Sequence, residues 1–299
     1  MTTTSQQTRR SKTRHRANAS AAVGGVLQHA ATQLREAANG KLSVKSLHEL
    51  RIACRRADAA LRLCKDAADG RAWRWLKRRL RTLRRACNEA RDDDVFDKWV
   101  QRHDTTSDKS LRRSIRAHRD DLQPQIVRRA QRLSEDHGFE RRSQKVVNQL
   151  RACELTGQIA QGFGRRLFDV VHRFVKSLPT RRDDDSALHR LRIVGKRLRY
   201  ASELVTAIWP DVELAELNEH LHSLQDRLGA IHDHTVGERR LRKQSLKGSG
   251  RSVPMLLQKA RNASIRQQRQ FWRWWQASSL ERMLADTTAN VQRLMRKTS

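Results

Sequence analysis

Two segments of the chain place a histidine and a series of cations at helical spacing, a pattern suited to binding phosphate groups. Residues three and four apart share one face of a helix, so each set forms a cationic stripe. A guanidinium donates a planar fork of hydrogen bonds to phosphate oxygens and keeps its proton, which predicts a polyanion as ligand. The first stripe comprises His48, Arg51, Arg55 and Arg62, and the second comprises His189, Arg192, Lys196 and Arg199.

A further run of cations extends from Arg74 to Arg85 with no acid among them. Like charges at this spacing repel one another along a helix, and an anionic ligand would offset that repulsion. Such a run is often only a solvated surface, but its place beside two stripes favours a binding face. The candidate phosphate-binding residues are His48, Arg51, Arg55, Arg56, Arg62, Arg74, Lys77, Arg78, Arg81, Arg85, His189, Arg192, Lys196, Arg197 and Arg199.

The two segments repeat each other at a constant, ungapped offset, the one that relates His48 to His189. The interval from His48 to Asp92 is the same as the interval from His189 to Asp233. A shared helical rhythm aligns leucines but does not preserve such an interval, so we interpret the pattern as an internal duplication. The expected organisation is a disordered basic arm over residues 1–18 and one domain over 19–299, with halves at about 19–178 and 179–299.

Composition also indicates a polyanionic partner. Lys and Arg total 63 against 32 Asp and Glu, which gives a formal charge of +31 and a pI near 11.5. The excess runs through the whole chain, so the fold itself should carry a basic surface. No apolar run approaches the length needed to span a bilayer, and residues 1–18 lack the apolar core of a secretory signal. We expect a cytoplasmic protein whose four cysteines are reduced and buried.

The sequence predicts an all-α fold, because helix-forming residues dominate and the chain has only four prolines. In each repeat an apolar seam lies beside the cationic stripe, and Gly195 in the second seam should let another helix approach closely. The seams are Leu47, Leu50, Cys54, Ala57, Leu61 and Cys64, and Leu188, Leu191, Gly195, Leu198, Ser202 and Val205. Helices are expected over 20–38, 43–66, 70–90, 110–134, 140–178, 185–208, 211–243, 254–277 and 279–296.

The paired pattern L-H-x-L-R-[IV]-x-x-[KR]-R resembles the CHAD family, the conserved-histidine α-helical domain. Leu47 to Arg62 and Leu188 to Tyr200 carry the match, which is specific as a pair and covers about residues 20–297. The resemblance implies two pseudo-symmetric antiparallel helical bundles around a basic central groove that binds inorganic polyphosphate. It also implies that the protein is located at polyphosphate granules. The sequence has no E-x-E-x-K signature of the CYTH hydrolases to which some members are fused.

The second half is less basic than the first. Where the first half has Lys77, Arg78, Arg79 and Arg81, the second has Asn218, Glu219, His220 and His222. The groove is therefore expected to carry more positive charge on the side of the first half than on that of the second.

Two roles are open for His48 and His189, which either donate to a phosphate or pair with a neighbouring helix. Asp92 and Asp233 are expected to orient arginines.

Catalytic signatures are missing from the sequence. There is no phosphate loop, nucleophile elbow or dinucleotide fingerprint, and no cofactor is predicted. His232-Asp233-His234 superficially resembles part of a metal phosphohydrolase site, but further spaced ligands are not evident. We therefore predict a non-enzymatic polyphosphate-binding protein. Non-specific binding to nucleic-acid backbones is the main alternative, and a polyphosphate-processing enzyme a distant third. The cluster Phe271 to Trp275 is expected to be core, with docking to a granule surface or partner as the alternative.

Overall fold

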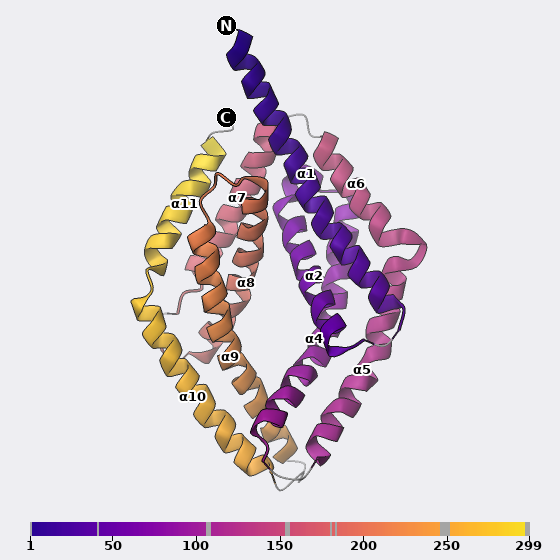
Figure 1. The fold of residues 1–299 in the computed structure, drawn as a ribbon, viewed down its shortest axis with the longest axis vertical. Helices are drawn as coiled ribbons and strands as arrows, with labels where there is room; N and C mark the ends of the chain where they lie inside the picture. Colours follow the sequence, from indigo (N-terminus) through magenta and orange to yellow (C-terminus); the bar gives the residue numbers. More distant parts are fainter. Residues whose placement is uncertain are drawn as a thin grey trace.

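The protein consists of long antiparallel helices arranged in two arms that meet at both ends (Figure 1). The computed structural model describes residues 2–40, 42–105, 109–152, 156–179, 181–182, 184–245 and 252–296, and nearly all their side chains from Ala19 on. No strand occurs within these ranges. The helices are α1 (Thr2–Ala38), α2 (Val44–Leu63), α3 (Lys65–Ala68), α4 (Arg71–His103), α5 (Ser110–Ser134), α6 (Gly138–Ala152), α7 (Thr156–Val175), α8 (Asp185–Ile208), α9 (Ala215–Ser245), α10 (Val253–Ala277) and α11 (Leu280–Arg296), with a 3-10 turn at Glu135–His137.

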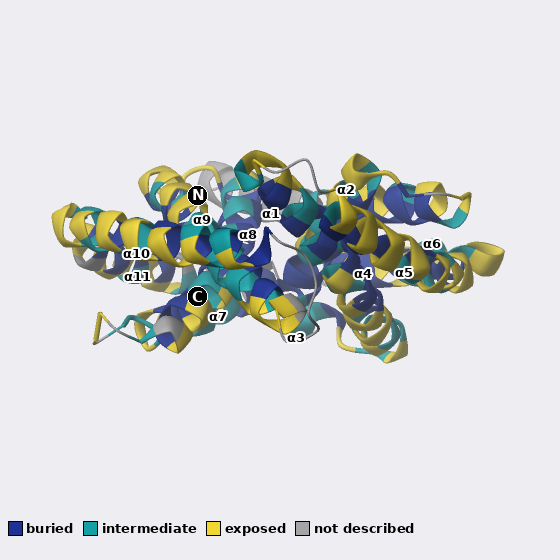
Figure 2. Ribbon diagram, turned by 90° about the horizontal axis from the view of Figure 1, so that it is seen from below, coloured by how far each residue is buried: buried dark blue, intermediate teal, exposed yellow. Residues whose placement is uncertain are grey.

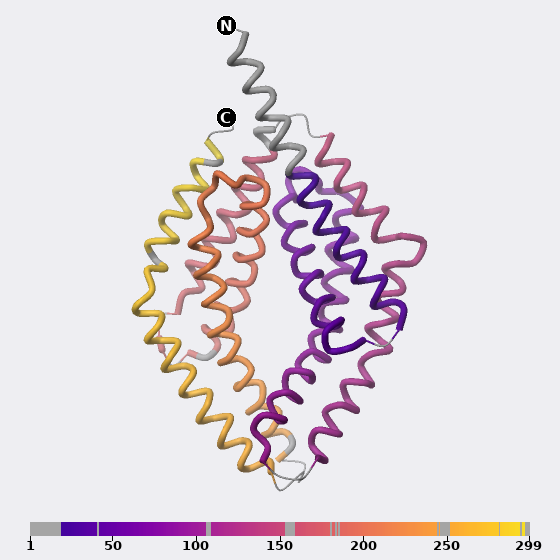
Figure 3. The backbone as a smooth tube through the Cα atoms, in the orientation of Figure 1, coloured from indigo at the N-terminus to yellow at the C-terminus, as the bar shows by residue number. Residues whose placement is uncertain are grey.

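The two arms contain helices in a corresponding order. Four helices of the first arm, α2, α4, α5 and α6, are separated from α8, α9, α10 and α11 of the second by nearly the same offset that relates His48 to His189. Figure 3 follows the backbone through both arms, with α1 to α6 in indigo to magenta and α8 to α11 in orange to yellow. Helix α1 begins at Thr2, earlier than the helix expected over 20–38, while the side chains of residues 1–18 lie outside the described part and the role of this basic arm stays a prediction.

The starts of both stripe-bearing helices are fixed by side-chain caps. Ser43 accepts a hydrogen bond at 3.0 Å from the backbone N–H of Ser46, and Asp184 accepts one at 2.9 Å from that of Ala187. These bonds satisfy N–H groups that have no partner within the helix. The caps lie equally far before His48 and His189, so both stripes begin at the same place on their helices.

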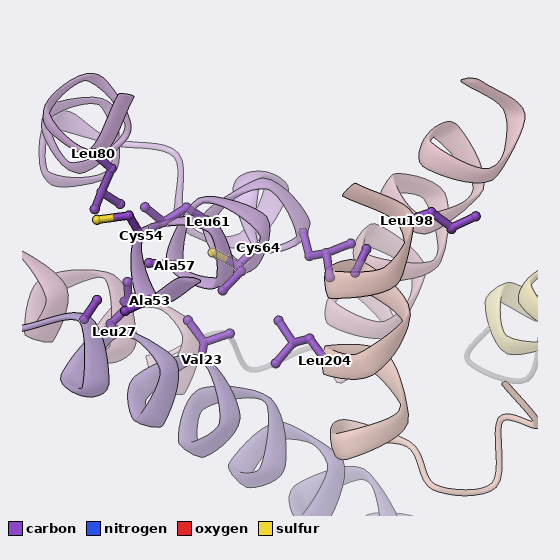
Figure 4. Packing of buried hydrophobic residues seen from close by; sticks show 14 of the residues in the cluster. Val23, Leu27, Ala53, Cys54, Ala57, Leu61, Cys64, Leu80, Leu198 and Leu204 are labelled. Carbon is purple, nitrogen blue, oxygen red and sulfur yellow. The ribbon is translucent and has the colours of Figure 1, made fainter. Parts of the chain in front are cut away.

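Both predicted seams are buried. Every member of the α2 seam is at most 1% exposed, and that of α8 is buried throughout. Figure 4 shows Ala57 and Leu61 of α2 and the adjoining Cys64 within this core, with Leu204 of α8 on the side that faces Val23 of α1. Burial of these side chains supplies the main stabilisation and orients the adjacent stripes. Viewed from below, buried residues lie where helices face one another and exposed residues cover the outside (Figure 2).

Gly195 allows the close helix packing predicted for it. A Cβ atom at this position would lie 3.3 Å from a ring carbon of Phe174 in α7 and 3.4 Å from a methyl of Leu224 in α9. Both distances are at the short end of van der Waals contact. The missing side chain therefore lets α8 approach α7 and α9 together.

Two helix predictions were wrong. The helix expected over 70–90 continues to His103. Its additional turns are stabilised because Phe96, Trp99 and Val100 pack with Leu241 and Leu256 of the other arm in a second apolar cluster. This cluster joins the ends of the arms. The single helix expected over 140–178 is two helices, α6 and α7, on either side of residues 153–155. Periodicity alone did not reveal the longer α4, since its last turns depend on contacts between the arms.

The cysteines and the aromatic cluster have structural roles. Cys54, Cys64 and Cys87 are free and buried, and burial raises the pKa of the Cys64 and Cys87 thiols to about 12. Cys153 lies outside the described residues.

In the aromatic cluster, Phe271 is fully buried, and Trp274 and Trp275 are partly buried and pack against the core. The expected core role of the cluster is thus confirmed for Phe271.

Candidate polyanion-binding cavity

A cavity of about 510 Å³ lies between the arms, and cations dominate its lining. Its walls come from α2, α3 and α4 of the first arm and from α7 and α8. Ten lining residues are cations, and two are acids, Asp58 and Asp169. The cations are Arg55, Arg62, Lys65, Lys77, Arg84, Arg166, Arg173, Arg192, Lys196 and Arg197.

Cations from α2 and α8 lie next to one another in the middle of this lining. Burial lowers the pKa of Lys196 to about 7, and repulsion from Arg192, Arg55 and Arg51 adds to the effect, while Asp233 opposes it. An ammonium whose charge is this unfavourable gains most from an added anion. Burial also lowers the pKa of Arg55. Its interaction with Tyr200, which includes a hydrogen bond, partly offsets this decrease.

Two arginines at equivalent positions have unused donors. Arg51 and Arg192 correspond in the two repeats, and each has a buried Nε without a hydrogen-bond partner in the described part of the chain. Arg51 uses one terminal nitrogen to donate to the Oδ1 of Asn88 at 3.2 Å. Burial, followed by repulsion from Arg55, lowers the pKa of Arg51 to about 10. Buried donors without acceptors are costly, and phosphate oxygens are suitable acceptors.

Asp58 neutralises part of the first stripe. Its carboxylate pairs with Lys77, with Arg62 at 2.9 Å and with Arg84 at 3.3 Å. Burial by itself would raise the pKa of Asp58, but these cations outweigh it and lower the pKa to about 2. Burial lowers the pKa of Lys77 to about 8 despite its pairing with Asp58. Arg62 and Lys77 therefore line the cavity as members of a network around an acid.

The second arm has the opposite arrangement around Arg199. This residue donates to Glu203 at 2.6 Å and to Gln225 at 2.9 Å, and its guanidinium lies 4.5 Å from the ring centre of Tyr200. Glu203 also pairs with Arg56 of α2 at 3.8 Å and so links the arms. Arg199 and Arg56 are thus partly neutralised, and neither lines the cavity.

The two histidines at the starts of the stripes are exposed and lie outside the cavity lining. Part of the His48 ring is nevertheless shielded from water, and this partial burial, followed by repulsion from Arg91 and Arg51, lowers its pKa. For His189 the causes are burial, Arg192 and Arg239, and its ring centre lies 5.5 Å from that of His232. Both are therefore mainly neutral without a ligand, and an adjacent phosphate would raise their pKa values. Contact with a ligand stays a prediction.

Four predicted residues of α4 lie on a different face. Arg74, Arg78, Arg81 and Arg85, here called the outer stripe, are exposed and do not line the cavity. On α4 the core side chains Leu76, Leu80 and Leu83 occupy one face, and Lys77 and Arg84 the face next to it. The outer stripe follows on the side away from the core.

Of the predicted residues, Arg55, Arg62, Lys77, Arg192, Lys196 and Arg197 line the cavity, and Arg51 adjoins them. Sequence reasoning missed Lys65, Arg84, Arg166 and Arg173 among the lining cations. Arg84 lies two helical turns after Lys77, a spacing that places both on one face of the helix. The sequence could therefore have identified Arg84 as a lining residue together with Lys77. Arg166 and Arg173 belong to α7, which carries no copy of the histidine motif, and only the packing of α7 on α8 brings them to the cavity.

The shared spacing of Asp92 and Asp233 brings both acids close to these cations. Burial raises the pKa of each carboxyl, while Arg51, Arg240 and Arg192 lower that of Asp92, and Arg192, Arg91 and Lys196 lower that of Asp233. Cations of both arms therefore act on each acid through their charge, while a role of Asp92 and Asp233 in orienting arginines stays a prediction. The neighbouring His234 accepts a hydrogen bond from the Trp99 indole at 2.9 Å. Within the described ranges no three His, Cys, Asp or Glu side chains cluster as ligands of a metal ion.

The chain is similar to a protein of known structure and matches one family. The described helices include none with the length and apolar character required to cross a membrane. No curated protein matches the chain significantly. The crystal structure of the CHAD domain from the plant Ricinus communis is similar, with a TM-score of 0.61 and 20% identity over 93% of this chain and 91% of that one. The family model of the CHAD domain matches residues 21–242, and the chain therefore belongs to the CHAD domain family.

Proposed function

We propose that the protein binds inorganic polyphosphate, without chemical conversion, in the cavity between its two arms. The observation that carries this proposal is the imbalance of charge in the lining, where ten cations face two acids. Both acids are engaged, Asp58 with three cations and Asp169 with Arg166 at 3.7 Å. Arg55, Arg173, Arg192, Lys196 and Arg197 form no ion pair with any described acid.

Buried cations without an acidic partner destabilise the folded protein, and a multivalent anion that binds among them relieves this cost. Removing charged groups from water costs several kcal/mol unless opposite charges compensate, about the scale of a protein's total stability. A chain of phosphates supplies several charges and many acceptors at once. Burial, and after it repulsion from neighbouring arginines, lowers the pKa of Lys196 and of Arg51, so both charges are unfavourable in the absence of a ligand. Membership of the CHAD family supports polyphosphate as the anion.

An internal duplication would explain why the cavity is lined from both arms. Arg51 and Arg55 of one copy and Arg192 and Lys196 of the other approach the same space from α2 and α8. One linear anion can then engage both copies, and contact with the second becomes intramolecular once the first is bound. We further propose that this binding brings the protein to polyphosphate granules.

Titration of the intact protein with polyphosphate tests the proposal. The triple variant Arg55→Gln, Arg192→Gln, Lys196→Gln should lose about a thousandfold or more in affinity, because charge-assisted hydrogen bonds contribute roughly 1.5–3 kcal/mol each. The control variant Arg266→Gln, Arg269→Gln, Arg273→Gln removes the same number of charges from exposed positions of α10. Equal losses in both variants would show that net charge, and not the cavity, determines binding.

Two further measurements separate the alternatives. Competition at physiological salt between polyphosphate and duplex DNA or RNA of matched charge identifies the preferred anion, and equal displacement would favour a nucleic-acid binder. The cavity lining favours polyphosphate, since base readers need stacking aromatics and the lining offers only Trp73 and Tyr200. Release of orthophosphate during incubation with divalent metal ions would contradict a non-catalytic role.

A further inference from the structure

The outer stripe of α4 is a strongly basic surface that the cavity does not use. Arg78, Arg81 and Arg85 are exposed and form no ion pair with an acid in the described part of the chain. Arg74 pairs only with Asp69, at 3.5 Å and with both side chains largely exposed. By helix geometry the four residues extend over about 16 Å. Four like charges in one row repel one another in the absence of a counter-ion, and a linear anion relieves that repulsion.

This stripe is continuous with the cavity. Lys77 and Arg84 line the cavity, and Arg81 lies four residues after the former and three before the latter. On a helix these separations make all three neighbours. On the far side of α4, Arg129 of α5 donates to the backbone carbonyl of Thr82 at 3.3 Å and adds another positive charge. A chain that leaves the cavity between Lys77 and Arg84 would therefore meet Arg81 first.

The equivalent face of α9 in the second arm carries no such row of cations. The positions that correspond to the outer stripe in the second repeat hold Ala215, Glu219, His222 and Asp226, all exposed. Two of these are acids, and His222 lies 3.4 Å from Glu203. A polyanion on this side would meet negative charge, whereas on the α4 side it meets four arginines. The surface next to the cavity is therefore asymmetric.

We propose that a polyphosphate chain too long for the cavity leaves it over α4 and lies along Arg74, Arg78, Arg81 and Arg85. This inference rests on the proposed binding in the cavity and adds to it a second, exposed segment of the site. The segment gives the bound chain a direction, since α4 supports the overhang and the equivalent face of α9 does not. It also predicts that affinity continues to rise with chain length after the cavity is full.

Short and long probes separate the two parts of the site. The variant Arg78→Gln, Arg81→Gln, Arg85→Gln should bind sodium triphosphate like the parent protein. It should bind a long-chain polyphosphate at least about tenfold more weakly, with a log–log salt dependence less steep by roughly 2–3 units, because about three phosphate contacts are lost. Circular dichroism and thermal unfolding should be unchanged, since the three side chains are exposed.

The matched control is again Arg266→Gln, Arg269→Gln, Arg273→Gln, which has the same spacing and charge on α10. An equal loss in this control, or no loss in the α4 variant, would overturn the inference. Weaker binding of duplex DNA but not of long polyphosphate by the α4 variant would assign the stripe to nucleic acid and also overturn it. If the cavity variant with Arg55, Arg192 and Lys196 replaced still binds triphosphate normally, the proposed function itself fails.

Discussion

Asp58 and Arg199 occupy equivalent positions of the two repeats, on α2 and α8, and have opposite charge and opposite surroundings. Asp58 is enclosed by Lys77, Arg62 and Arg84, and Arg199 by Glu203 and Gln225. The i,i+4 partners are inverted as well, since Arg62 corresponds to Glu203. The two arms thus keep an i,i+4 ion pair at the same point but place the excess positive charge on the first arm.

Replacing Asp58 by Asn should destabilise the unliganded protein. The isosteric change leaves Lys77, Arg62 and Arg84 without their shared acid, and breaking a buried ion pair costs about 3 kcal/mol or more. Urea unfolding measures the change, with Asp169→Asn, whose pair is more exposed, as a control expected to cost about 1 kcal/mol or less. Added polyphosphate should restore most of the lost stability by supplying negative charge. A loss that polyphosphate does not reduce would contradict the assigned electrostatic cause.

Replacing Glu203 by Gln should strengthen polyphosphate binding. Glu203 pairs with Arg199, with Arg56 across the arms and with His222, none of which lines the cavity, so its replacement frees positive charge beside the bound anion. Half-buried pairs of this kind contribute up to about 1 kcal/mol, which corresponds to roughly a fivefold gain in affinity. Isothermal titration at constant salt gives the value. Weaker binding would mean that Glu203 positions Arg199 for the ligand instead of masking it.

The sequence predicted most of the local structure but only part of the cavity. The seams of α2 and α8 were correctly placed because the 3.6-residue period fixes which side chains share a face, as Leu47 and Leu191 illustrate. Helix α4 extends beyond the predicted end because Phe96 and Trp99 pack against the other arm, and no local pattern encodes that contact. Arg166 and Arg173 were missed for the same reason, since tertiary packing alone brings α7 to the site.

Face assignment on α4 shows a further limit. Lys77 and Arg78 are adjacent in the sequence and both belong to the cationic run, yet one lines the cavity and the other is exposed on the outer stripe. A run of cations around a helix specifies charge but not which side meets a neighbouring helix. Only the positions of α2 and α8 divide the run into two surfaces.

Polyphosphate affinity should fall as pH rises through about 7, because that is the lowered pKa of Lys196. Arg192, Arg55 and Arg51 lower this pKa and Asp233 raises it, and a bound anion would raise it further, so binding above pH 7 takes up a proton. His48 and His189 are already neutral above pH 7, while Lys77, whose pKa is about 8, also titrates between pH 7 and 9, so Lys196→Met should remove the part of the dependence centred near pH 7 and leave the part near pH 8. Calorimetry in buffers of different ionisation enthalpy counts the protons. A pH profile that is unchanged in the variant would assign the dependence to another group.

Lys196 should make the stability of the unliganded protein rise with pH, whereas it makes polyphosphate affinity fall. Because the pKa of Lys196 is lower in the folded chain than in the unfolded one, the unfolded chain binds more protons between pH 7 and about 10, and stability from this residue rises with pH over that window. Below pH 7 the charged ammonium is held in an unfavourable place. Lys196→Met should therefore raise the melting temperature of the unliganded protein at pH 6 while it weakens polyphosphate binding. A lower melting temperature at that pH would mean that Lys196 is stabilising as a cation.

Adjacent residues of α8 should separate folding from binding. Leu191 is fully buried in the seam, so Leu191→Asp places a charge in the core and should cost about 4 kcal/mol or more, enough to abolish cooperative unfolding. Arg192, one residue later, lines the cavity and has no described ion-pair partner, so Arg192→Gln should keep its helices and lose about tenfold in affinity. Circular dichroism and polyphosphate titration of both variants give the comparison. If Arg192→Gln lost its helices as readily as Leu191→Asp, the separation of seam from stripe on α8 would be wrong, because both side chains would then support the same core.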